Sequence, residues 1–344
     1  MATPPSPASP WWRQWMRRGV QTDLVVDPSA PTLPNPDAVE TQPSGDPDAL
    51  APAEVGALPS GSIIAGYRIE RLLGRGALGA TYLALDPETE TAVAIKTIAL
   101  AREFDGPTLA EVRRRFSLEA AAASRLVHPD IVSIYGAGEE QGLCFIVMEA
   151  LTGSDLSRYT RPARLLPEPV VFRIGQRVAE ALAFAHGKGV VHRDVKPANV
   201  VVDLTTHQVK LTDFGVARLT DAASTRTGLV LGTPSFMAPE QLEGRSPDAR
   251  SDLYSLGVML FQLLTGQLPY ESTSLGQLLR AIASEEPQNL RSLRPDLPQA
   301  AADLLAALLN KSAAARPGNG MVVSLALQRI EAEWDASQRL GVGS

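Results

Sequence analysis

Cysteine is almost absent from this sequence of 344 residues, and Cys144 is the only one. A single cysteine excludes an internal disulfide and a metal site built from several cysteines. Cys144 lies in the apolar stretch 143–148, where we expect a buried structural thiol rather than a reactive one. The cytoplasm is the simplest location for such a chain.

Long apolar segments are also missing. A membrane-spanning helix needs about 20 mostly apolar residues, and the best candidate, 253–264, is too short and contains Gly257 and Gln262. The first residues, MATPPSPASPWW, lack the positive start and apolar stretch of a signal peptide. We therefore expect no transmembrane span and a cytoplasmic protein.

An excess of positive charge is missing as well, because 32 Lys and Arg stand against 38 Asp and Glu, for a net charge of −6. The chain as a whole therefore gives no electrostatic reason to expect nucleic acid as a partner. The hydrophobic fraction of 44% and the charged fraction of 20% are typical of a globular protein with a large core.

The first 60 residues differ in composition from the rest, since they contain 12 of the 27 prolines. Such a segment buries too little apolar surface to offset its ordering entropy, so we predict a disordered tail. Within it, residues 11–20 (WWRQWMRRGV) contain three of the four tryptophans and three arginines. This Trp/Arg motif suits docking on a partner or on an anionic membrane surface. An unstructured terminus without a role is the alternative.

Regular structure is predicted from about residue 61 onward. Alternating or β-branched runs between turn sequences predict strands at 67–74, 80–85, 91–99, 131–135 and 143–148. Residues 108–126 contain no Gly or Pro and predict a helix.

The second half of the sequence is mostly helical in pattern. Apolar residues recur at helical spacing and predict a buried face of Val171, Ile174, Val178, Leu182 and Ala185. Residues 253–264 are apolar on nearly all sides, as expected for a helix in the centre of a core. Five strands with one helix, followed by a run of helices, predict an α+β fold of two lobes that meet at a cleft.

The first chemical motif is GRGALG, from Gly74 to Gly79, between two predicted strands. Glycines allow backbone amides to close over phosphates without a side chain in the way. A dinucleotide-binding fold needs a helix directly after this spacing, whereas the β-type sequence ATYLAL follows here. The motif therefore favours a phosphate-covering loop between strands, with an ordinary hairpin turn as the alternative.

Lys96 ends the apolar sequence VAIK, 17 residues after Gly79. A lysine inside an apolar strand is costly unless its ammonium group meets an anion, and in a cleft that anion would be a nucleotide's α- and β-phosphates. An acid is also needed to hold the ammonium. Glu119 on the following predicted helix is the first choice and Glu111 the second, and a solvated helix position is the alternative for Glu119.

The sequence VVHRDVKPANVV, at 190–201, concentrates five chemically different polar side chains in one loop. The motif DFG begins at Asp213, 19 residues after Asp194. A second carboxylate at a tight turn suits a hard cation with oxygen ligands, such as Mg²⁺. A purely structural chain is not expected to carry both motifs, in this order, downstream of VAIK.

These motifs in this order resemble the signature set of the protein kinases, specifically the eukaryotic-like Ser/Thr kinases of bacteria. The resemblance continues in GTPSFMAPE at 232–240, SDLYSLG at 251–257 and AARPGNG around Arg316, and it covers about 64–335. It implies ATP-dependent transfer of the γ-phosphate to Ser or Thr hydroxyls of proteins.

The resemblance also implies a bilobal protein kinase fold, with a small β-rich N-lobe at about 64–148 and a larger α-helical C-lobe at about 152–335. We accordingly divide the chain into the tail, 1–60, and a kinase domain, 61–340.

Catalytic roles follow for Asp194, which would accept or orient the proton of the substrate hydroxyl, and for Lys196, which would neutralise charge on the transferring phosphoryl group. The residues that the resemblance assigns to ATP are Gly74, Gly76, Gly79, Lys96, Glu119, Glu149, Leu151 and Asp155. Asn199 and Asp213 would hold Mg²⁺, with Mn²⁺ as an alternative.

Several assignments are finer. Backbone groups of Glu149 and Leu151 would bind adenine, and Asp155 would bind the ribose, although Asp155 also suits the cap of a helix that starts there. The resemblance assigns His192 to packing against Phe214 rather than to proton transfer. Thr81 replaces the valine usual in the family, and we expect its hydroxyl to lower ATP affinity modestly.

Arg193 directly precedes the catalytic aspartate. This arrangement is similar to that of kinases that are switched on by phosphorylation of the activation segment, the residues between the DFG and APE sequences. A phosphate there would give Arg193 a charge-assisted partner. We predict autophosphorylation at Thr225 or Thr227. The position of Thr233, before the APE sequence, resembles that of a threonine in the Ser/Thr branch of the family. Activity without phosphorylation is the alternative. Glu240 and Arg316 resemble the ion pair that closes the kinase domain.

A pseudokinase, which binds ATP as a scaffold without chemistry, is the alternative function. Such proteins usually lose the lysine or one of the two aspartates, and here Lys96, Asp194 and Asp213 are all present. The enzyme is therefore the favoured interpretation. Its implied partners are protein substrates and, as a further partner, a cognate phosphatase.

Overall fold

The structure is a computed structural model that describes residues 58–76, 79–104, 106–214 and 234–341. From Pro59 onward the described residues form one compact unit. The predictions that lie outside the described residues are those on the Trp/Arg motif at 11–20 and on Thr225, Thr227 and Thr233. The boundary at residue 60 also stays a prediction.

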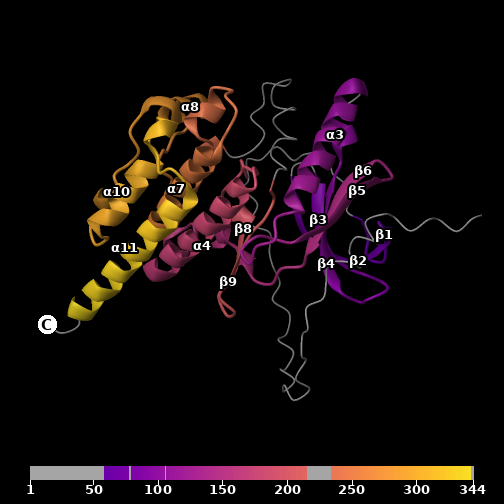
Figure 1. Cartoon of the computed structure of the whole chain (residues 1–344), viewed down its shortest axis with the longest axis horizontal. Coiled ribbons are helices and arrows are strands. Elements are labelled where there is room, and N and C mark those ends of the chain that lie inside the picture. Colours follow the sequence, from indigo (N-terminus) through magenta and orange to yellow (C-terminus); the bar gives the residue numbers. More distant parts are fainter. Residues whose placement is uncertain (1–57, 77–78, 105, 215–233, 342–344) are drawn as a thin grey trace, which may run out of the picture. The chain divides into compact units, whose positions relative to one another are not determined.

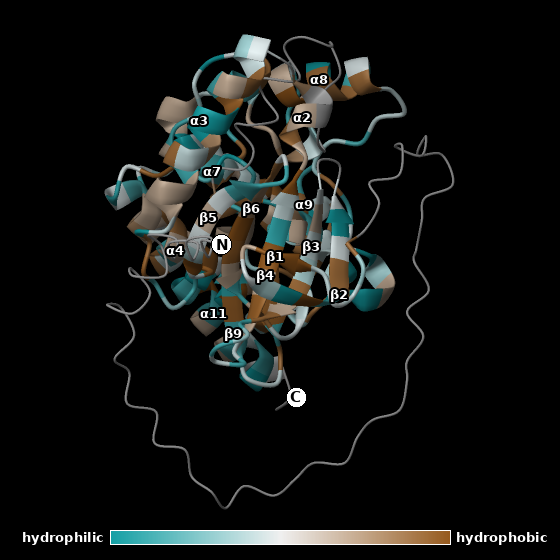
Figure 2. Ribbon diagram, turned by 90° about the vertical axis from the view of Figure 1, so that its right-hand side faces the viewer, coloured by the Kyte–Doolittle hydropathy of each residue, from teal (hydrophilic) through white to brown (hydrophobic). Residues whose placement is uncertain are grey.

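An antiparallel sheet of six strands forms the first half of this unit, in the order β1-β2-β3-β4-β6-β5. The strands are β1 (Ile63–Ile64), β2 (Tyr67–Gly76), β3 (Gly79–Leu85), β4 (Ala92–Ile98), β5 (Ile134–Glu140) and β6 (Leu143–Glu149). Alternate residues of β3 are buried, as its alternating sequence predicted. Figure 2 shows the hydrophobic residues that run along these strands.

Two helices accompany the sheet, α2 (Leu100–Glu103) and α3 (Gly106–Ala123). α3 buries Val112, Phe116 and Ala120 and packs against β5. Its Arg113 also pairs with Glu139 of β5, with Nη2 2.7 Å from Oε1. The predicted helix at 108–126 is thus present, but it begins and ends two to three residues earlier.

The strand predicted at 131–135 is wrong in its position. Ile131 forms only an isolated parallel bridge with Leu211, and β5 starts at Ile134. β5 continues to Glu140 because it pairs with β6 through a two-residue turn. Gln141 and Gly142 in that turn both have positive φ, of 52° and 78°, which fits the tight hairpin geometry. Pairing across this turn outweighs the low strand propensity of the glycines within β5.

The second half of the unit is helical, and in Figure 1 α4, α7, α10 and α11 pack side by side, apart from the sheet. The helices are α4 (Glu168–Gly187), α6 (Pro239–Leu242), α7 (Ala249–Thr265), α8 (Leu275–Ser284), α9 (Leu290–Leu293), α10 (Gln299–Leu308) and α11 (Gly320–Gly341). The predicted buried face of α4 is confirmed, and α7 is buried almost throughout. Among the described residues, no helix has an apolar stretch long enough to span a membrane.

Short elements that the sequence did not predict complete this half. A second sheet has the order β7-β8-β9, and these strands are β7 (Ser154–Asp155), β8 (Val200–Asp203) and β9 (Gln208–Leu211). The 3-10 helices are η1 (Leu156–Tyr159), η2 (Pro162–Arg164), η3 (Pro197–Asn199), η4 (Pro234–Phe236) and η5 (Ala313–Ala315). Strands of two to four residues are too short for a periodic signal. The predicted α+β architecture of two halves is confirmed.

Candidate active site

A pocket of about 770 Å³ lies between the strands β2, β3 and β4 and the loops around η3 and β9. It collects residues from segments that are far apart in the sequence. The predicted site residues that line it are Gly74, Gly76, Gly79, Lys96, Glu149, Leu151, Asp155, Arg193, Asp194, Lys196, Asn199 and Asp213. Glu119 is not among the lining residues.

The three glycines lie where β2 and β3 meet, and they are needed for different reasons. A Cβ atom on Gly74 would have no neighbour within 4 Å, and on Gly76 only Gly79 O at 3.9 Å, so side chains there would occupy pocket space. A Cβ atom on Gly79 would lie 1.8 Å from the carbonyl oxygen of Thr97 on β4. Gly79 therefore allows the close packing of β3 on β4, while Gly74 and Gly76 leave room for a ligand.

Lys96 projects from β4, opposite Thr81 of β3. Its Nζ lies 2.8 Å from Oδ2 of Asp213, and the two side chains are 23% and 25% exposed. Burial alone would raise the pKa of Asp213, but the charge and hydrogen bond of Lys96, with smaller contributions from His192 and Lys196, outweigh it and lower the pKa. Asp213 is thus held ionised beside the ammonium group.

The expected ion pair between Lys96 and Glu119 does not occur in this structure. Oε1 of Glu119 instead lies 3.9 Å from Nη1 of Arg193. The fallback candidate is also engaged elsewhere, since hydrogen bonds from Arg114 and then Arg115 lower the pKa of Glu111 to about 2. Lys96 does not pair with Glu119 because its ammonium group already forms an ion pair with Asp213.

The loop before β8 brings the proposed catalytic groups into direct contact. Lys196 Nζ lies 2.7 Å from Oδ2 of Asp194. The amide nitrogen of Asn199 donates to the same Oδ2, at 2.9 Å, and to the main-chain oxygen of Asp194, at 2.7 Å. The Asp194 carboxylate is therefore oriented by two donors and remains 35% exposed at the pocket.

Asp252 anchors the loop before β8 through its main chain, a role that the sequence analysis missed. Its carboxylate is 0% exposed and accepts main-chain hydrogen bonds from His192, at 2.8 Å, and Arg193, at 2.7 Å. Arg193 has a φ of 71° and Asp213 a φ of 65°, which are uncommon for residues with side chains and often occur at functional sites. The signal in the sequence was an acid directly before the apolar run of α7.

His192 packs against Phe214, as the resemblance implied, with ring centroids 4.5 Å apart. Its Nε2 lies 2.7 Å from the main-chain oxygen of Thr212, and its Nδ1 accepts the main-chain N–H of Asp194 at 3.2 Å. Both ring nitrogens are therefore used to join the two loops. This arrangement agrees with the packing role that the resemblance implied for His192.

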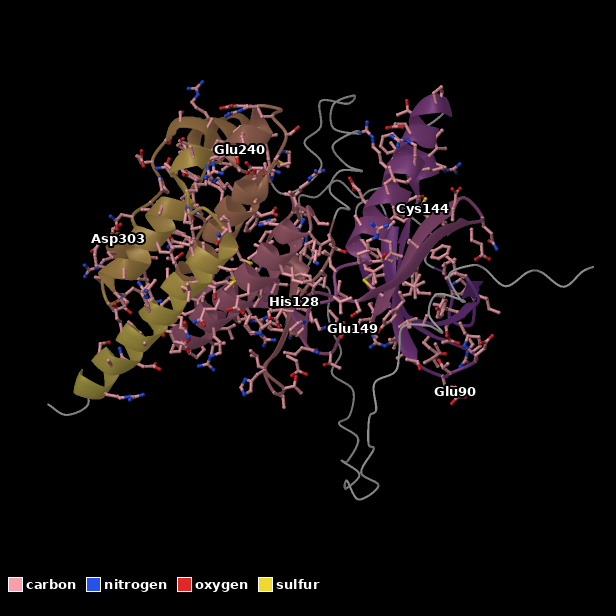
Figure 3. The ribbon with its side chains drawn as sticks, in the orientation of Figure 1. Glu90, His128, Cys144, Glu149, Glu240 and Asp303 are labelled. Carbon is pink, nitrogen blue, oxygen red and sulfur yellow. The ribbon has the colours of Figure 1, made fainter. Side chains whose placement is uncertain are left out.

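Lys210 is a second residue that the sequence analysis missed. It is 7% exposed on β9, and its Nζ lies 2.8 Å from Oε2 of Glu149. The same oxygen accepts the main-chain N–H of Ser133 at 3.2 Å. Figure 3 labels Glu149 in the region where the strands meet the helices. The Glu149 side chain thus links the end of β6 to β9 and to Ser133. Glu149 also lines the pocket.

Of the two interpretations of Asp155, the structure shows the helix cap, and ribose binding stays a prediction. Its Oδ1 accepts the main-chain N–H of Ser157 at 2.9 Å and so caps η1. It also lines the pocket.

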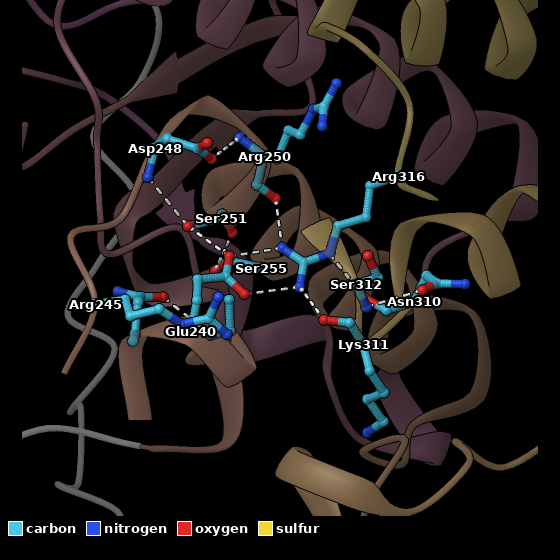
Figure 4. A network of polar contacts seen from close by, with 12 residues as sticks. Glu240, Arg245, Asp248, Arg250, Ser251, Ser255, Asn310, Lys311, Ser312 and Arg316 are labelled. Atoms are coloured by element: carbon cyan, nitrogen blue, oxygen red, sulfur yellow. Dashed lines mark hydrogen bonds and ion pairs between the residues drawn. The ribbon is translucent and has the colours of Figure 1, made fainter. Parts of the chain in front are cut away.

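The predicted pair of Glu240 and Arg316 is present, as Figure 4 shows. The two guanidinium nitrogens donate to the two carboxylate oxygens at 2.7 and 2.8 Å. Burial would raise the pKa of Glu240, but hydrogen bonds from Arg316 and Ser251 outweigh it and lower the pKa. The pair joins the end of the activation segment to the helices that follow.

Comparisons with known proteins agree with this arrangement. The family model described as "Protein kinase domain" matches residues 67–330. The serine/threonine-protein kinase pkn3 of Myxococcus xanthus is 40% identical over 278 residues, which are 78% of this chain and 50% of that protein. PknJ of Mycobacterium tuberculosis is 43% identical over 219 residues, 62% of this chain and 36% of that protein. The chain therefore spans half or less of the length of these relatives.

Solved structures give the same result. The kinase domain of PknI from Mycobacterium tuberculosis superposes with a TM-score of 0.65 at 32% identity, covering 80% of this chain and 100% of that one. The family match covers well over half of the sequence, and the pocket contains the lysine and both aspartates of the family's motifs. The chain belongs to the protein kinase family and is similar to its bacterial Ser/Thr members.

Proposed function

We propose that this protein is an ATP-dependent Ser/Thr protein kinase that transfers the γ-phosphate of ATP to hydroxyl groups of proteins. The observation that carries the proposal is the meeting of Lys96, Asp194 and Asp213 in one pocket with the glycines of β2 and β3. These groups come from three separate segments and have no shared role in packing.

ATP fits the lining of this pocket. Gly74 and Gly76 leave space over which backbone amides can cover phosphates, and Lys96 supplies a positive charge for the α- and β-phosphates. Adenine would lie against the main chain of Glu149 and Leu151, and Asp155 would accept a ribose hydroxyl.

A divalent cation fits the donor set on the opposite wall. Asp213 offers an ionised carboxylate, and Asn199 points its amide nitrogen at Asp194, which leaves its amide oxygen for a ligand. Such hard oxygen donors suit Mg²⁺, or alternatively Mn²⁺. Asp213 and Asn199 would hold the cation, and its positive charge would offset negative charge on the phosphates.

The chemical step requires one proton transfer. As the substrate hydroxyl oxygen forms its bond to the γ-phosphorus and ADP leaves, the hydroxyl proton passes towards Asp194. Asn199 and Lys196 hold the Asp194 carboxylate in place. Lys196 also offsets the negative charge of the phosphoryl group in transit.

Phosphorylation of the activation segment is part of the proposal. A phosphate on Thr225 or Thr227, before Thr233, would compete for the Arg193 guanidinium. Glu119 could then turn from Arg193 to Lys96, and Asp213 would be released to the cation. Incubation with ATP and Mg²⁺ followed by phosphosite mapping by mass spectrometry checks this step, and an active enzyme with an unmodified segment would refute it.

Location and partners complete the proposal. We propose a cytoplasmic enzyme that acts on protein substrates and is reversed by a cognate phosphatase. The Trp/Arg motif at 11–20 stays a prediction, and deletion of residues 1–60 tests it. If localisation and partner binding are unchanged after that deletion, the motif has no docking role.

The proposed activity is tested by phosphate transfer from radiolabelled ATP to a protein substrate. We expect Asp194→Asn to lower kcat by roughly 10²–10⁴-fold, because the proton acceptor is lost. Asp303→Asn, at an exposed position of α10, is the matched control and should leave kcat unchanged. If the wild-type chain is folded but labels no hydroxyl residue, or if both variants behave alike, the proposal fails.

A further inference from the structure

The segment between β7 and α4 forms a basic surface next to the active site. Arg158, Arg161 and Arg164 lie within seven residues of one another, and all three side chains are exposed. Between Asp155 and Glu168 the sequence contains no acidic residue. We refer to these three residues as the arginine cluster.

Neighbouring acids do not neutralise the arginine cluster. Glu168 is bound to Arg294, and the carboxylate of Asp155 caps η1. Arg158 donates to the neutral hydroxyl of Ser154 at 2.8 Å. Among the residues that the structure describes, no ion pair involves any member of the cluster. Its three positive charges are therefore available to an external anion.

The cluster is held in a fixed place relative to the catalytic loop. Leu156 of η1 is 0% exposed, and η1 packs against η3, which follows directly after Lys196. Pro162 of η2 lies against Gly266, where even a Cβ atom would come within 2.8 Å of the proline ring. Arg158 itself lines the active-site pocket. A group bound by the cluster would thus lie beside a substrate in that pocket.

The surface between the arginines is hollowed and partly apolar. A depression of about 390 Å³ is lined by Arg158, Tyr159, Arg164, Leu165 and Leu166. The tyrosine and the two leucines are half-buried. Carboxylates at the rim with an apolar side chain between them would match this surface.

Few acids oppose such a ligand from the catalytic loop. The residue before Asn199 is Ala198, which lines the pocket and adds no charge, and Lys196 adds a further cation nearby. A nucleic acid fits less well, because three arginines make a short patch on a chain with a net charge of −6. The apolar base of the depression also favours a peptide.

We propose that the arginine cluster binds acidic side chains that flank the phosphoacceptor, so that the substrate class is proteins with Ser or Thr in acidic segments. This inference rests on the proposed kinase function and adds the specificity of the same site. Arginine is well suited to this role because its planar guanidinium binds carboxylates in a bidentate manner.

A pair of peptides tests the proposal on the full chain. One has a single central threonine with three aspartates on each side, and the other has asparagine in place of every aspartate. Fluorescence anisotropy gives Kd for each peptide, and steady-state phosphorylation gives KM and kcat. We expect Kd and KM to be about tenfold lower for the aspartate peptide, which corresponds to about 1.4 kcal/mol. The difference should shrink when salt is raised from about 50 to 500 mM.

Two double variants separate recognition from general charge effects. Arg161→Glu/Arg164→Glu should reduce the preference to less than about twofold, and Arg158 is left intact because it lines the pocket. Arg329→Glu/Arg339→Glu on α11, where both arginines are exposed, has the same change in charge and should keep the preference. Melting temperatures of all three proteins establish that they are folded.

The outcomes are distinct from those of the proposed function. Equal Kd values for the two peptides, or a preference that survives Arg161→Glu/Arg164→Glu, would overturn the arginine cluster as a recognition surface. Loss of binding to phosphatidylserine vesicles in that variant, without peptide discrimination, would reassign the surface to membranes and also overturn the proposal. Preferential binding of the aspartate peptide without phosphorylation would support the cluster while the kinase function fails.

Discussion

Replacing Glu240 by Gln tests whether the buried ion pair in Figure 4 holds the helical half together. The Arg316 side chain is 0% exposed and that of Glu240 is 8% exposed. The ring of Tyr254 lies 4.9 Å from the guanidinium carbon, and Ser251 donates to Glu240 at 2.7 Å. Glu240→Gln keeps the size of the side chain but leaves the guanidinium charge buried without its counter-ion.

The magnitude follows from what remains around Arg316. Loss of one partner from a buried ion pair typically costs about 3–5 kcal/mol. The guanidinium keeps main-chain acceptors at Asn310, Arg250 and Lys311. Because these carbonyls and the Gln oxygen still accept hydrogen bonds, we expect the lower end of that range, about 3 kcal/mol. For a domain of this size that loss corresponds to a decrease in Tm of roughly 6 °C or more.

Equilibrium urea unfolding of the full chain measures this difference. Glu243→Gln is the matched control, since Glu243 is 50% exposed and pairs with Arg245 at the surface. We expect the control to lose less than about 1 kcal/mol. A loss below about 1 kcal/mol for Glu240→Gln, or one equal to the control, would refute the reasoning. Combining Glu240→Gln with Arg316→Met should be less harmful than the two changes added, because the isolated charge is gone.

The same pair gives a pH dependence with a definite sign. The pKa of Glu240 is lowered from 4.5 in the folded chain, since hydrogen bonds from Arg316 and Ser251 outweigh the effect of burial. Its contribution to stability is therefore complete above pH 4.5 and is lost as the pH falls through the folded-state pKa. The difference in unfolding free energy between wild type and Glu240→Gln should accordingly be constant near neutral pH and decrease below about pH 4.5.

Two further predictions concern the strands around the pocket. Gly79→Ala should lower the free energy of unfolding by more than about 2 kcal/mol and raise the KM for ATP, because its Cβ would collide with the carbonyl of Thr97. Gly76→Ala is the matched control, with an expected loss below about 1 kcal/mol, and equal losses in urea unfolding would contradict the geometry. Lys210→Met should cost about 2 kcal/mol in the same assay, since it leaves the Glu149 carboxylate with only a main-chain donor. A change below about 0.5 kcal/mol would show that the contact between Lys210 and Glu149 does not stabilise the folded chain.

The sequence alone predicted the chemistry that we propose for this protein, because that chemistry depends on residue types in a fixed order. Asp194 and Asp213 stand in motifs whose composition has no explanation in packing. Local periodicity also sufficed for β3 and for α7, whose burial patterns follow from their own residues.

The tertiary structure decided which charged groups meet. Lys96 pairs with Asp213 rather than with Glu119, and Glu119 lies near Arg193 instead. The sequence contained several acids that could satisfy Lys96, and a difference of a few ångströms selects one of them. No local pattern sets distances of that size between segments that are far apart in the chain.

The same limit explains the elements and surfaces that the sequence did not reveal. β5 begins at Ile134 because β6 and the turn at Gly142 fix its register, which a residue pattern at 131–135 does not contain. The sequence did not reveal the arginine cluster as a surface, because its place beside the catalytic loop depends on the packing of η1 against η3. The pairing of Glu168 with Arg294 also depends on the fold. Residue types determine what a site can do, whereas competition among distant contacts determines which of its groups are partners.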